Sequence, residues 1–403
     1  MDKLDDILKA NVVSEGDEDT RDKLLGAAFI VVNVNDEDGF LYQGAAGRIG
    51  FEPSSPPFSV DSFTFLASLT KLVTSTCIMQ LCEKGVLNLD FDVLSQLPEM
   101  RALKVLKGFD ADGEPLLEEH SRTITLRHAI HMTLLTHTFG SPYVRMNPDL
   151  IRWSNHIGRP VRHLEWSIQG LSVPLVFAPG DGWVYGPGPD WAGLLLERVT
   201  GQSLGEYMQS HVFRPLGMND TGFWPEKLPQ TASRTVAWTH RTTSHTLEPA
   251  EKLTPVEYEM ENGGSGLWST AEDYARFLRG LLQGKVVTGD ALRLIFSPQL
   301  NEVQKKALNH TLNQPDQHRD LAPEFPFGLE LDHSVAGVIN LQHVPGKRRR
   351  GSLMWLGMLS SHWWIDRETG IAAVLIVNVR DLGDTVVERL YDELERAVYA
   401  GRK

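Results

Sequence analysis

Strand-like segments stand at both ends of this chain, and a long helical stretch separates them. At the start, small and β-branched residues at 27–34 turn back into residues 40–44, which is the pattern of an antiparallel hairpin. After residue 327, short strand-like runs return at 327–331, 338–341, 352–357, 362–365 and 371–377, and they lead into an amphipathic segment at 384–399. The two ends must therefore meet to share one sheet, and this requirement restricts the fold more than any other feature.

This order of segments predicts an α/β (α+β) fold with two lobes, since a chain of 403 residues exceeds the size of one ordinary core. Residues 1–66 and 323–403 would form a lobe around an antiparallel sheet flanked by helices. Residues 67–322 would form an inserted, mainly helical lobe, with helices expected at 68–85, 124–135, 190–200, 204–213 and 271–282.

The composition excludes several classes of protein. A net charge of −13 argues against nucleic acid as a partner, because binding to phosphates needs a clustered basic surface. No run approaches the roughly 18 apolar residues of a membrane span, and the acidic start, Met1-Asp2-Lys3-Leu4-Asp5-Asp6, differs from a signal peptide. We therefore expect a cytoplasmic protein that binds no membrane, with its two cysteines, Cys77 and Cys82, as free thiols.

The tetrad Ser68-Leu69-Thr70-Lys71 lies where a loop enters a helix. A spacing of three residues places a serine hydroxyl and a lysine amine on one helix face, within reach of each other. Serine becomes a nucleophile only when a base accepts its proton, and burial near positive charge favours the neutral lysine that could do so. The competing interpretation is a serine that caps the helix, with a solvated lysine one turn later.

Three further segments support the catalytic interpretation. Tyr185 lies in a Gly/Pro loop, 177–187, just before a predicted helix. A glycine loop at 263–266 leads into another helix, with a capping pattern at Ser269 and Glu272. Trp355-Leu356-Gly357 lies in a predicted strand shortly before Trp363-Trp364.

With these four signals in order, the chain resembles the serine β-lactamase-like superfamily, which contains class C β-lactamases, DD-peptidases, esterases and acyltransferases. Ser68-Leu69-Thr70-Lys71 matches the Ser-x-x-Lys motif, and Tyr185-Gly186-Pro187 falls at the Tyr-x-Asn motif. Trp355-Leu356-Gly357 falls at the Lys-Thr-Gly or His-x-Gly motif. The resemblance covers nearly the whole chain and is greatest to fungal transesterases of the lovastatin acyltransferase type.

The resemblance implies a role for each residue. Ser68 would be the nucleophile, and Lys71 and Tyr185 the paired general base and acid, with the first base left open because coupled groups share their titration. The backbone N–H groups of Ser68 and Met358 would form the oxyanion hole. No metal and no cofactor is expected, and we expect His137 to hydrogen-bond the backbone of the loop over the site.

Two departures from the family pattern limit the classes of substrate to be expected. Pro187 replaces the amide that contacts an acylamino side chain in the family, and Trp355 replaces the cation that meets a substrate carboxylate. β-Lactamase and peptidase activity are therefore not expected. The remaining pocket, with Trp183, Pro187, Trp355 and Gly357 as predicted substrate-binding residues, favours a hydrophobic acyl chain or a fused-ring alcohol.

The sequence leaves two features with two interpretations each. Lys347-Arg348-Arg349-Arg350 is either a solvated turn, which we favour, or a docking patch for an acyl-carrier domain. His128 and His131 are three residues apart, but no Glu stands between them and no third ligand follows, so a structural role is preferred to a metal site.

The function predicted by this pattern is a serine acyltransferase. It would move an acyl group from a thioester or ester donor to an alcohol of a hydrophobic small molecule through a Ser68 acyl-enzyme. A carboxylesterase would use the same residues, because transfer and hydrolysis differ only in whether the pocket excludes water and holds an alcohol. A catalytically silent binding homologue is a third possibility, against which the joint presence of Ser68, Lys71 and Tyr185 argues.

Overall fold

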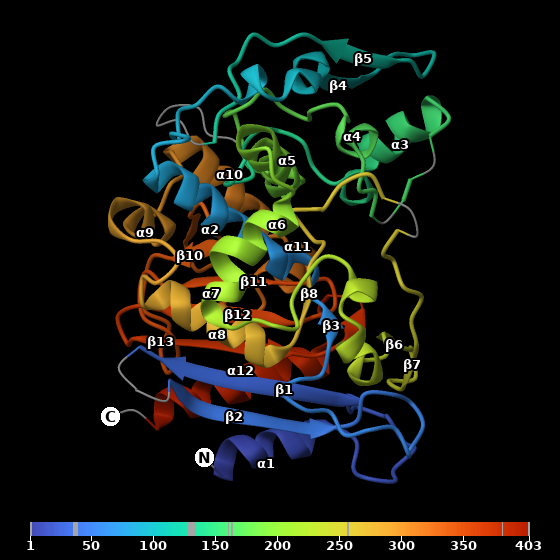
Figure 1. Cartoon of the computed structure of the whole chain (residues 1–403). Coiled ribbons are helices and arrows are strands. Elements are labelled where there is room, and N and C mark those ends of the chain that lie inside the picture. The colour runs from blue at the N-terminus through green and yellow to red at the C-terminus, as the bar shows by residue number, and fades with distance from the viewer. Residues whose placement is uncertain are drawn as a thin grey trace.

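The main sheet of the protein is built from both ends of the chain (Figure 1). The computed structural model describes residues 2–34, 39–126, 134–159, 161–162, 164–255, 258–380 and 382–401. Seven antiparallel strands follow the order β2-β1-β13-β12-β11-β10-β9. Their bounds are β1 Gly26–Asn33, β2 Phe40–Gly47, β9 Leu331–His333, β10 Val338–Asn340, β11 Leu353–Leu356, β12 His362–Asp366 and β13 Ile371–Ile376.

The two chain ends meet at the pairing of β1 with β13. Ala28 lies opposite Ile376, and Asn33 lies opposite Ile371. Both strands consist almost entirely of buried residues, which is expected of strands covered on both faces. The predicted antiparallel sheet made from both termini is therefore confirmed, while the lobe boundaries at residues 66 and 323 stay a prediction.

Helices cover both faces of the sheet. On one face, α1 (Asp2–Asn11) packs against α12 (Thr385–Ala400), and Tyr391 of α12 contacts the ring of Trp364 in β12. On the other side, α8 (Ala271–Leu282) packs against β1 and β13, and the remaining helices lie beyond it (Figure 1). These are α2 Thr70–Glu83, α3 Pro148–His156, α4 Ile168–Leu171, α5 Gly188–Thr200, α6 Leu204–Met208, α7 Arg214–Leu216, α9 Gly289–Ile295, α10 Glu302–Leu312 and α11 Pro315–Leu321.

The helical part also contains short strands that the sequence pattern did not indicate. A hairpin of β4 (Val105–Phe109) and β5 (Pro115–Glu118) projects at one end of the molecule (Figure 1), and β14 (Val379–Arg380), β6 (Thr239–Arg241) and β7 (Leu247–Pro249) form a three-stranded sheet. The helix predicted at 124–135 is not seen in its described flanks, where 134–137 form a turn. Residues 127–133, with His128 and His131, lie outside the described residues.

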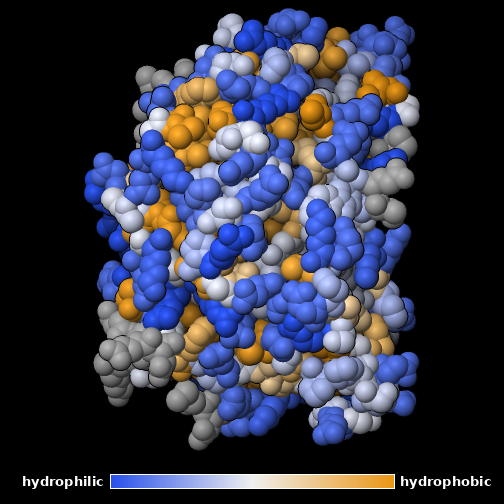
Figure 2. Space-filling model, viewed as in Figure 1, coloured by the Kyte–Doolittle hydropathy of each residue, from blue (hydrophilic) through white to orange (hydrophobic). Residues whose placement is uncertain are grey.

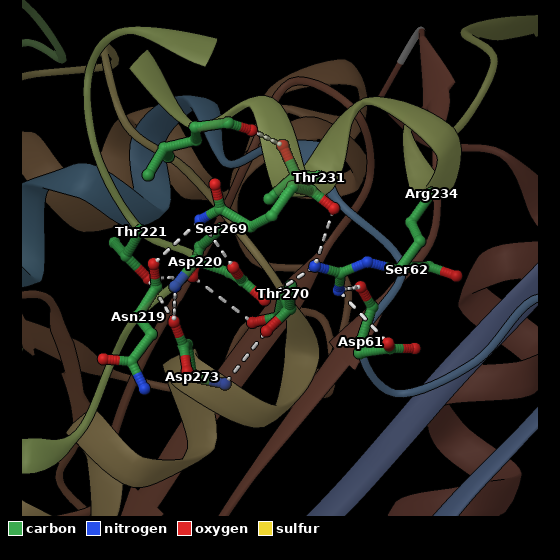
Figure 3. A network of polar contacts seen from close by, with 12 residues as sticks. Asp61, Ser62, Asn219, Asp220, Thr221, Thr231, Arg234, Ser269, Thr270 and Asp273 are labelled. Atoms are coloured by element: carbon green, nitrogen blue, oxygen red, sulfur yellow. Dashed lines mark hydrogen bonds and ion pairs between the residues drawn. The ribbon is translucent and has the colours of Figure 1, made fainter. Parts of the chain in front are cut away.

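A two-stranded sheet joins the segment before Ser68 to the segment after the glycine loop. In it, β3 (Thr64–Phe65) pairs with β8 (Trp268–Ser269). A polar network anchors β8 further: Ser269 Oγ lies 2.6 Å from Thr221 Oγ1, and Thr221 donates to Asp273 at the start of α8 (Figure 3). The cap of α8 is Thr270 rather than the predicted Ser269, since Thr270 Oγ1 accepts from the Asp273 N–H.

Of the four residues in the basic run at 347–350, the first two are buried and the last two are exposed. Neither a solvated turn nor a docking patch therefore describes all four residues. Arg348 is fully buried, and its guanidinium donates to both carboxylate oxygens of Glu395 in α12 at 2.8 Å. Lys347 is also buried and pairs with Asp392. These two cations are neutralised inside the protein, so a docking patch of four charges is wrong.

The surface in the view of Figure 2 is mostly hydrophilic, with hydrophobic residues in separate patches. Within the part of the chain that the structure describes, no helix combines the length and the hydrophobicity that crossing a membrane requires.

Candidate active site

Ser68 lies in a single 3₁₀ turn, Ala67–Leu69, that runs directly into α2. Its hydroxyl does not cap the helix: the N-cap position of α2 is Leu69, and no side chain bonds there. Ala67, just before the serine, has a φ of +48°, a conformation that costs a non-glycine residue free energy and that is concentrated at functional sites. The capping interpretation of Ser68 is therefore excluded.

The three predicted catalytic side chains meet in space. Ser68 Oγ lies 2.5 Å from Tyr185 Oη, and Lys71 Nζ lies 3.1 Å from Ser68 Oγ. Lys71 Nζ also lies 4.9 Å from the centre of the Tyr185 ring. Lys71 is buried, whereas Ser68 and Tyr185 are half-buried and so can meet a substrate. The serine hydroxyl is thus within proton-transfer distance of both an amine and a phenol.

Met358 follows β11 in a tight turn beside Ser68. The Ser360 N–H donates to the Gly357 carbonyl at 2.8 Å, so Met358 is the second residue of the turn, and the bond that closes the turn leaves its N–H unused. A side chain on Gly357 would place its Cβ 2.7 Å from the Leu66 carbonyl oxygen. Because residue 357 is glycine, this turn can lie against the chain that leads into Ser68. An oxyanion hole formed by the N–H groups of Ser68 and Met358 requires this close approach.

Lys71 has two further partners that the sequence interpretation missed. Its Nζ donates to Tyr143 Oη at 3.0 Å and to the Gly264 carbonyl at 2.8 Å. Tyr143 in turn donates to Asp190 Oδ2 at 3.0 Å. Asp190 is buried in the first turn of α5, and burial raises the pKa of its carboxyl group.

His137 holds the loop that carries Tyr185. Its Nδ1 accepts the Gly186 N–H at 3.3 Å, and its carbonyl accepts the Val184 N–H at 2.9 Å. The predicted bond from His137 to this loop is therefore confirmed. Burial lowers the pKa of His137 well below its ordinary value, so the ring is neutral near pH 7 and can accept at Nδ1.

A cavity of about 490 Å³ opens beside Ser68, which is a size typical of small-molecule sites. Its wall combines the polar groups of the site with a set of apolar side chains and a few charged ones. The lining residues are Ser68, Tyr143, Arg145, Met146, Leu164, Tyr185, Ser265, Gln317, Arg319, Asp320, Leu321, Trp355, Leu356, Met358 and Leu382.

Three of the four predicted substrate-binding residues, Trp183, Pro187 and Gly357, do not line this cavity. Trp183 is buried, and its ring packs 6.1 Å from that of His137 and 6.2 Å from that of His333. Pro187 occupies the N-cap position of α5 and lines a separate, smaller cavity. Trp183 and Pro187 are close to Tyr185 in the sequence, but this did not place them at the cavity, because the loop packs them against the core. Trp355 does line the cavity, whereas Gly357 stands in the chain between two lining residues, Leu356 and Met358, without lining it itself.

Comparison with known proteins places this arrangement in a family. The beta-lactamase family model matches residues 10–397. The chain is 33% identical to a lovastatin esterase of Penicillium rubens, over 85% of this chain and 87% of the relative. It is also 33% identical to a monacolin J acid methylbutanoyltransferase of Aspergillus terreus, over 86% of this chain and 84% of that protein.

Solved structures agree with these relatives. The unliganded simvastatin synthase (LovD) of Aspergillus terreus, as its selenomethionyl derivative, superimposes with a TM-score of 0.86 at 28% identity, covering 99% of this chain and 98% of that one. EstCE1, a hydrolase with promiscuous acyltransferase activity, superimposes with a TM-score of 0.73 at 20% identity, which shows a shared fold. The chain therefore belongs to the beta-lactamase family.

Proposed function

We propose that this protein is a serine acyltransferase that moves an acyl group from a thioester or ester to an alcohol of a hydrophobic small molecule. The observation that carries the proposal is the contact of Ser68 Oγ with both Tyr185 Oη and Lys71 Nζ at the wall of a cavity of about 490 Å³. The methylbutanoyltransferase relative and the other acyltransferases of similar sequence support transfer as the reaction, in fungal secondary metabolism.

The proposed reaction has two halves that use the same groups. Ser68 Oγ attacks the carbonyl carbon of the donor and its proton passes to the Lys71–Tyr185 pair, while the N–H groups of Ser68 and Met358 face the developing oxyanion. The bond from the carbonyl carbon to the leaving sulfur or oxygen breaks, and the pair returns the proton to the leaving group. The acceptor alcohol then gives its proton to the pair and attacks the acyl-enzyme, and Ser68 regains a proton as it leaves.

Ester hydrolysis is the second candidate function, and the lovastatin esterase relative favours it. Water would replace the alcohol in the second half-reaction without a change of residues. Partly apolar walls supplied by Leu321, Trp355, Leu356 and Leu382 support an acceptor with a hydrophobic body, since they would exclude water once such an acceptor is bound.

Intact-mass analysis tests the proposal directly. After incubation with p-nitrophenyl butyrate, we expect a butyryl adduct on the chain, located at Ser68 by peptide mapping. Hydrophobic alcohols added to this acyl-enzyme should discharge it as esters faster than water does. Discharge only by water would support the esterase, and absence of both adduct and turnover would support a catalytically silent binding protein.

Trp355 is proposed to set the size of the acyl group. Its ring lines the cavity and lies 5.2 Å from the Tyr185 ring, where the sequence pattern of antibiotic-hydrolysing relatives has a cation. We expect Trp355→Leu to raise kcat/KM for decanoyl over butyryl esters by about tenfold, in the range of one to two methylene groups of discrimination. Steady-state kinetics with a series of p-nitrophenyl esters measures this, and an unchanged chain-length preference would contradict it.

We also propose that the donor can be bound to an acyl-carrier domain. The support is a pair of exposed arginines that line the cavity, Arg145 and Arg319, since guanidinium groups bind phosphate well; Arg319 also pairs with Asp316 and Asp320, with which the phosphate of a phosphopantetheine arm would compete. A cytoplasmic location is proposed as well, supported by Cys77 and Cys82, which are both free thiols.

A further inference from the structure

The amine of Lys71 is surrounded by three oxygen atoms. They are the Gly264 carbonyl at 2.8 Å, Tyr143 Oη at 3.0 Å and Ser68 Oγ at 3.1 Å. Lys71 is only 4% exposed, so its nitrogen is directed by these partners rather than by water. A carbonyl oxygen can only accept, and one N–H of Lys71 is therefore fixed on Gly264.

Tyr143 fixes a second N–H, because its own proton is used elsewhere. It donates to Asp190 Oδ2 at 3.0 Å, which leaves the phenol oxygen to accept from Lys71. Burial, and next the negative charge of Asp190, raise the pKa of Tyr143 well above its ordinary value, so the phenol keeps its proton at any working pH. The Asp190 carboxylate therefore determines that the Tyr143 oxygen accepts, and does not donate, in its hydrogen bond with Lys71.

The hydrogen bonds close into a ring through a fifth residue. Asn262 Nδ2 donates to Asp190 Oδ1 at 2.5 Å, and Asn262 Oδ1 accepts the Gly264 N–H at 3.1 Å. The ring requires glycine at 264, since a Cβ there would lie 2.1 Å from Asp190 Oδ2. Lys71, Tyr143, Asp190, Asn262 and Gly264 therefore hold one another in a single geometry.

We propose that Tyr143 and Asp190 are positioning residues that direct Lys71 toward Ser68. With two hydrogens fixed on Gly264 and Tyr143, the remaining position on the nitrogen faces Ser68 Oγ. That position holds the lone pair in the neutral amine and a third hydrogen in the ammonium ion, so the proton path between Ser68 and Lys71 is aligned before substrate binds. This inference rests on the proposed function, in which Ser68 is acylated.

The first test is Tyr143→Phe, measured as the rate of acylation by p-nitrophenyl butyrate. Loss of the second partner frees the amine to rotate, and we expect kcat to fall about 10- to 100-fold, because a small misplacement of a reacting group costs up to about a hundredfold. KM for this small ester should stay within about twofold. Tyr42→Phe is the matched control: it removes another phenol–carboxylate bond, from Tyr42 Oη to Asp5 Oδ1 at 2.6 Å, in β2 and away from the cavity.

The second test is Asp190→Asn, measured as the pH profile of kcat. The variant keeps the side-chain volume but removes the negative charge that attracts the Lys71 ammonium ion and so favours its charged form. We expect the acidic limb of the profile to move to lower pH while kcat falls. The other groups near the amine do not supply this change: His137 is neutral, and Tyr143 stays protonated.

The outcomes separate this inference from the proposed function. If the unaltered protein forms no acyl adduct, the proposed function fails. If it does, and Tyr143→Phe acylates as fast as Tyr42→Phe, the positioning role is overturned. A second result would also overturn it. In that result, Tyr143→Phe and Asp190→Asn lose activity only in proportion to their lower melting temperatures, and the acidic limb of the Asp190→Asn profile does not move. Such a result would show that the two residues have a structural role.

Discussion

Replacement of Ser68 by alanine is expected to abolish acyl transfer and ester hydrolysis, with a loss of more than about 10⁴-fold in kcat. In the proposed mechanism both half-reactions pass through a covalent bond to Ser68 Oγ, and neighbouring groups cannot replace it, because Lys71 and Tyr185 are proposed to move protons. Intact-mass spectra of the variant should show no butyryl adduct after prolonged incubation with p-nitrophenyl butyrate.

The same variant should remain folded. Ser68 is half-buried, and its hydroxyl does not cap α2, so its removal takes no bond from the helix backbone. We expect a melting temperature within a few degrees of that of the unaltered protein. A variant that keeps its turnover would show that the nucleophile lies elsewhere, whatever the distances in the cavity.

Tyr185→Phe and Lys71→Ala are each expected to lower kcat by at least about a hundredfold, the lower end for loss of a general acid or base. Tyr185→Phe removes only the oxygen that lies 2.5 Å from Ser68 Oγ and leaves the ring in place beside Trp355. Pre-steady-state kinetics that separate acylation from deacylation should show both steps slowed, because in the proposed mechanism the pair moves a proton in each.

Lys71→Ala carries an additional cost to the fold. Without the amine, the buried Asp190 loses the positive charge of Lys71, which lowers the pKa of its carboxyl group, so we expect a lower melting temperature as well as a lower rate. Tyr185→Phe therefore provides the cleaner measure of catalysis. Full activity of that variant would refute the role given to this loop.

The fold could be predicted where the sequence pattern is local and strong. Strands at 338–341, 352–357, 362–365 and 371–377 and the helix at 271–282 were indicated by hydrophobic runs, and the structure has β10, β11, β12, β13 and α8 there. The β4–β5 hairpin could not be found in this way, since its strands carry charged and exposed residues without alternation.

The proposed catalytic residues could be predicted because they lie in short sequence motifs, whereas the residues that hold Lys71 in place come from distant parts of the chain. Tyr143 was one aromatic among many in this region, and only the folded chain shows that its oxygen lies between Lys71 and Asp190, residues 72 and 47 positions away. Arg348 was misinterpreted for the same reason: its partner, Glu395, lies in the last helix. Pairings of this kind depend on tertiary packing, which single-sequence patterns do not contain.

The pairing of β1 with β13 affects how the protein is made in the cell. A ribosome adds about 5–20 residues per second, so β1 is exposed roughly 20–70 s before its second neighbour is synthesised. During that interval an almost wholly apolar strand has one open edge, which can pair with other nascent chains. The surroundings of Ser68 are completed late as well, because Met358 is synthesised only shortly before β13.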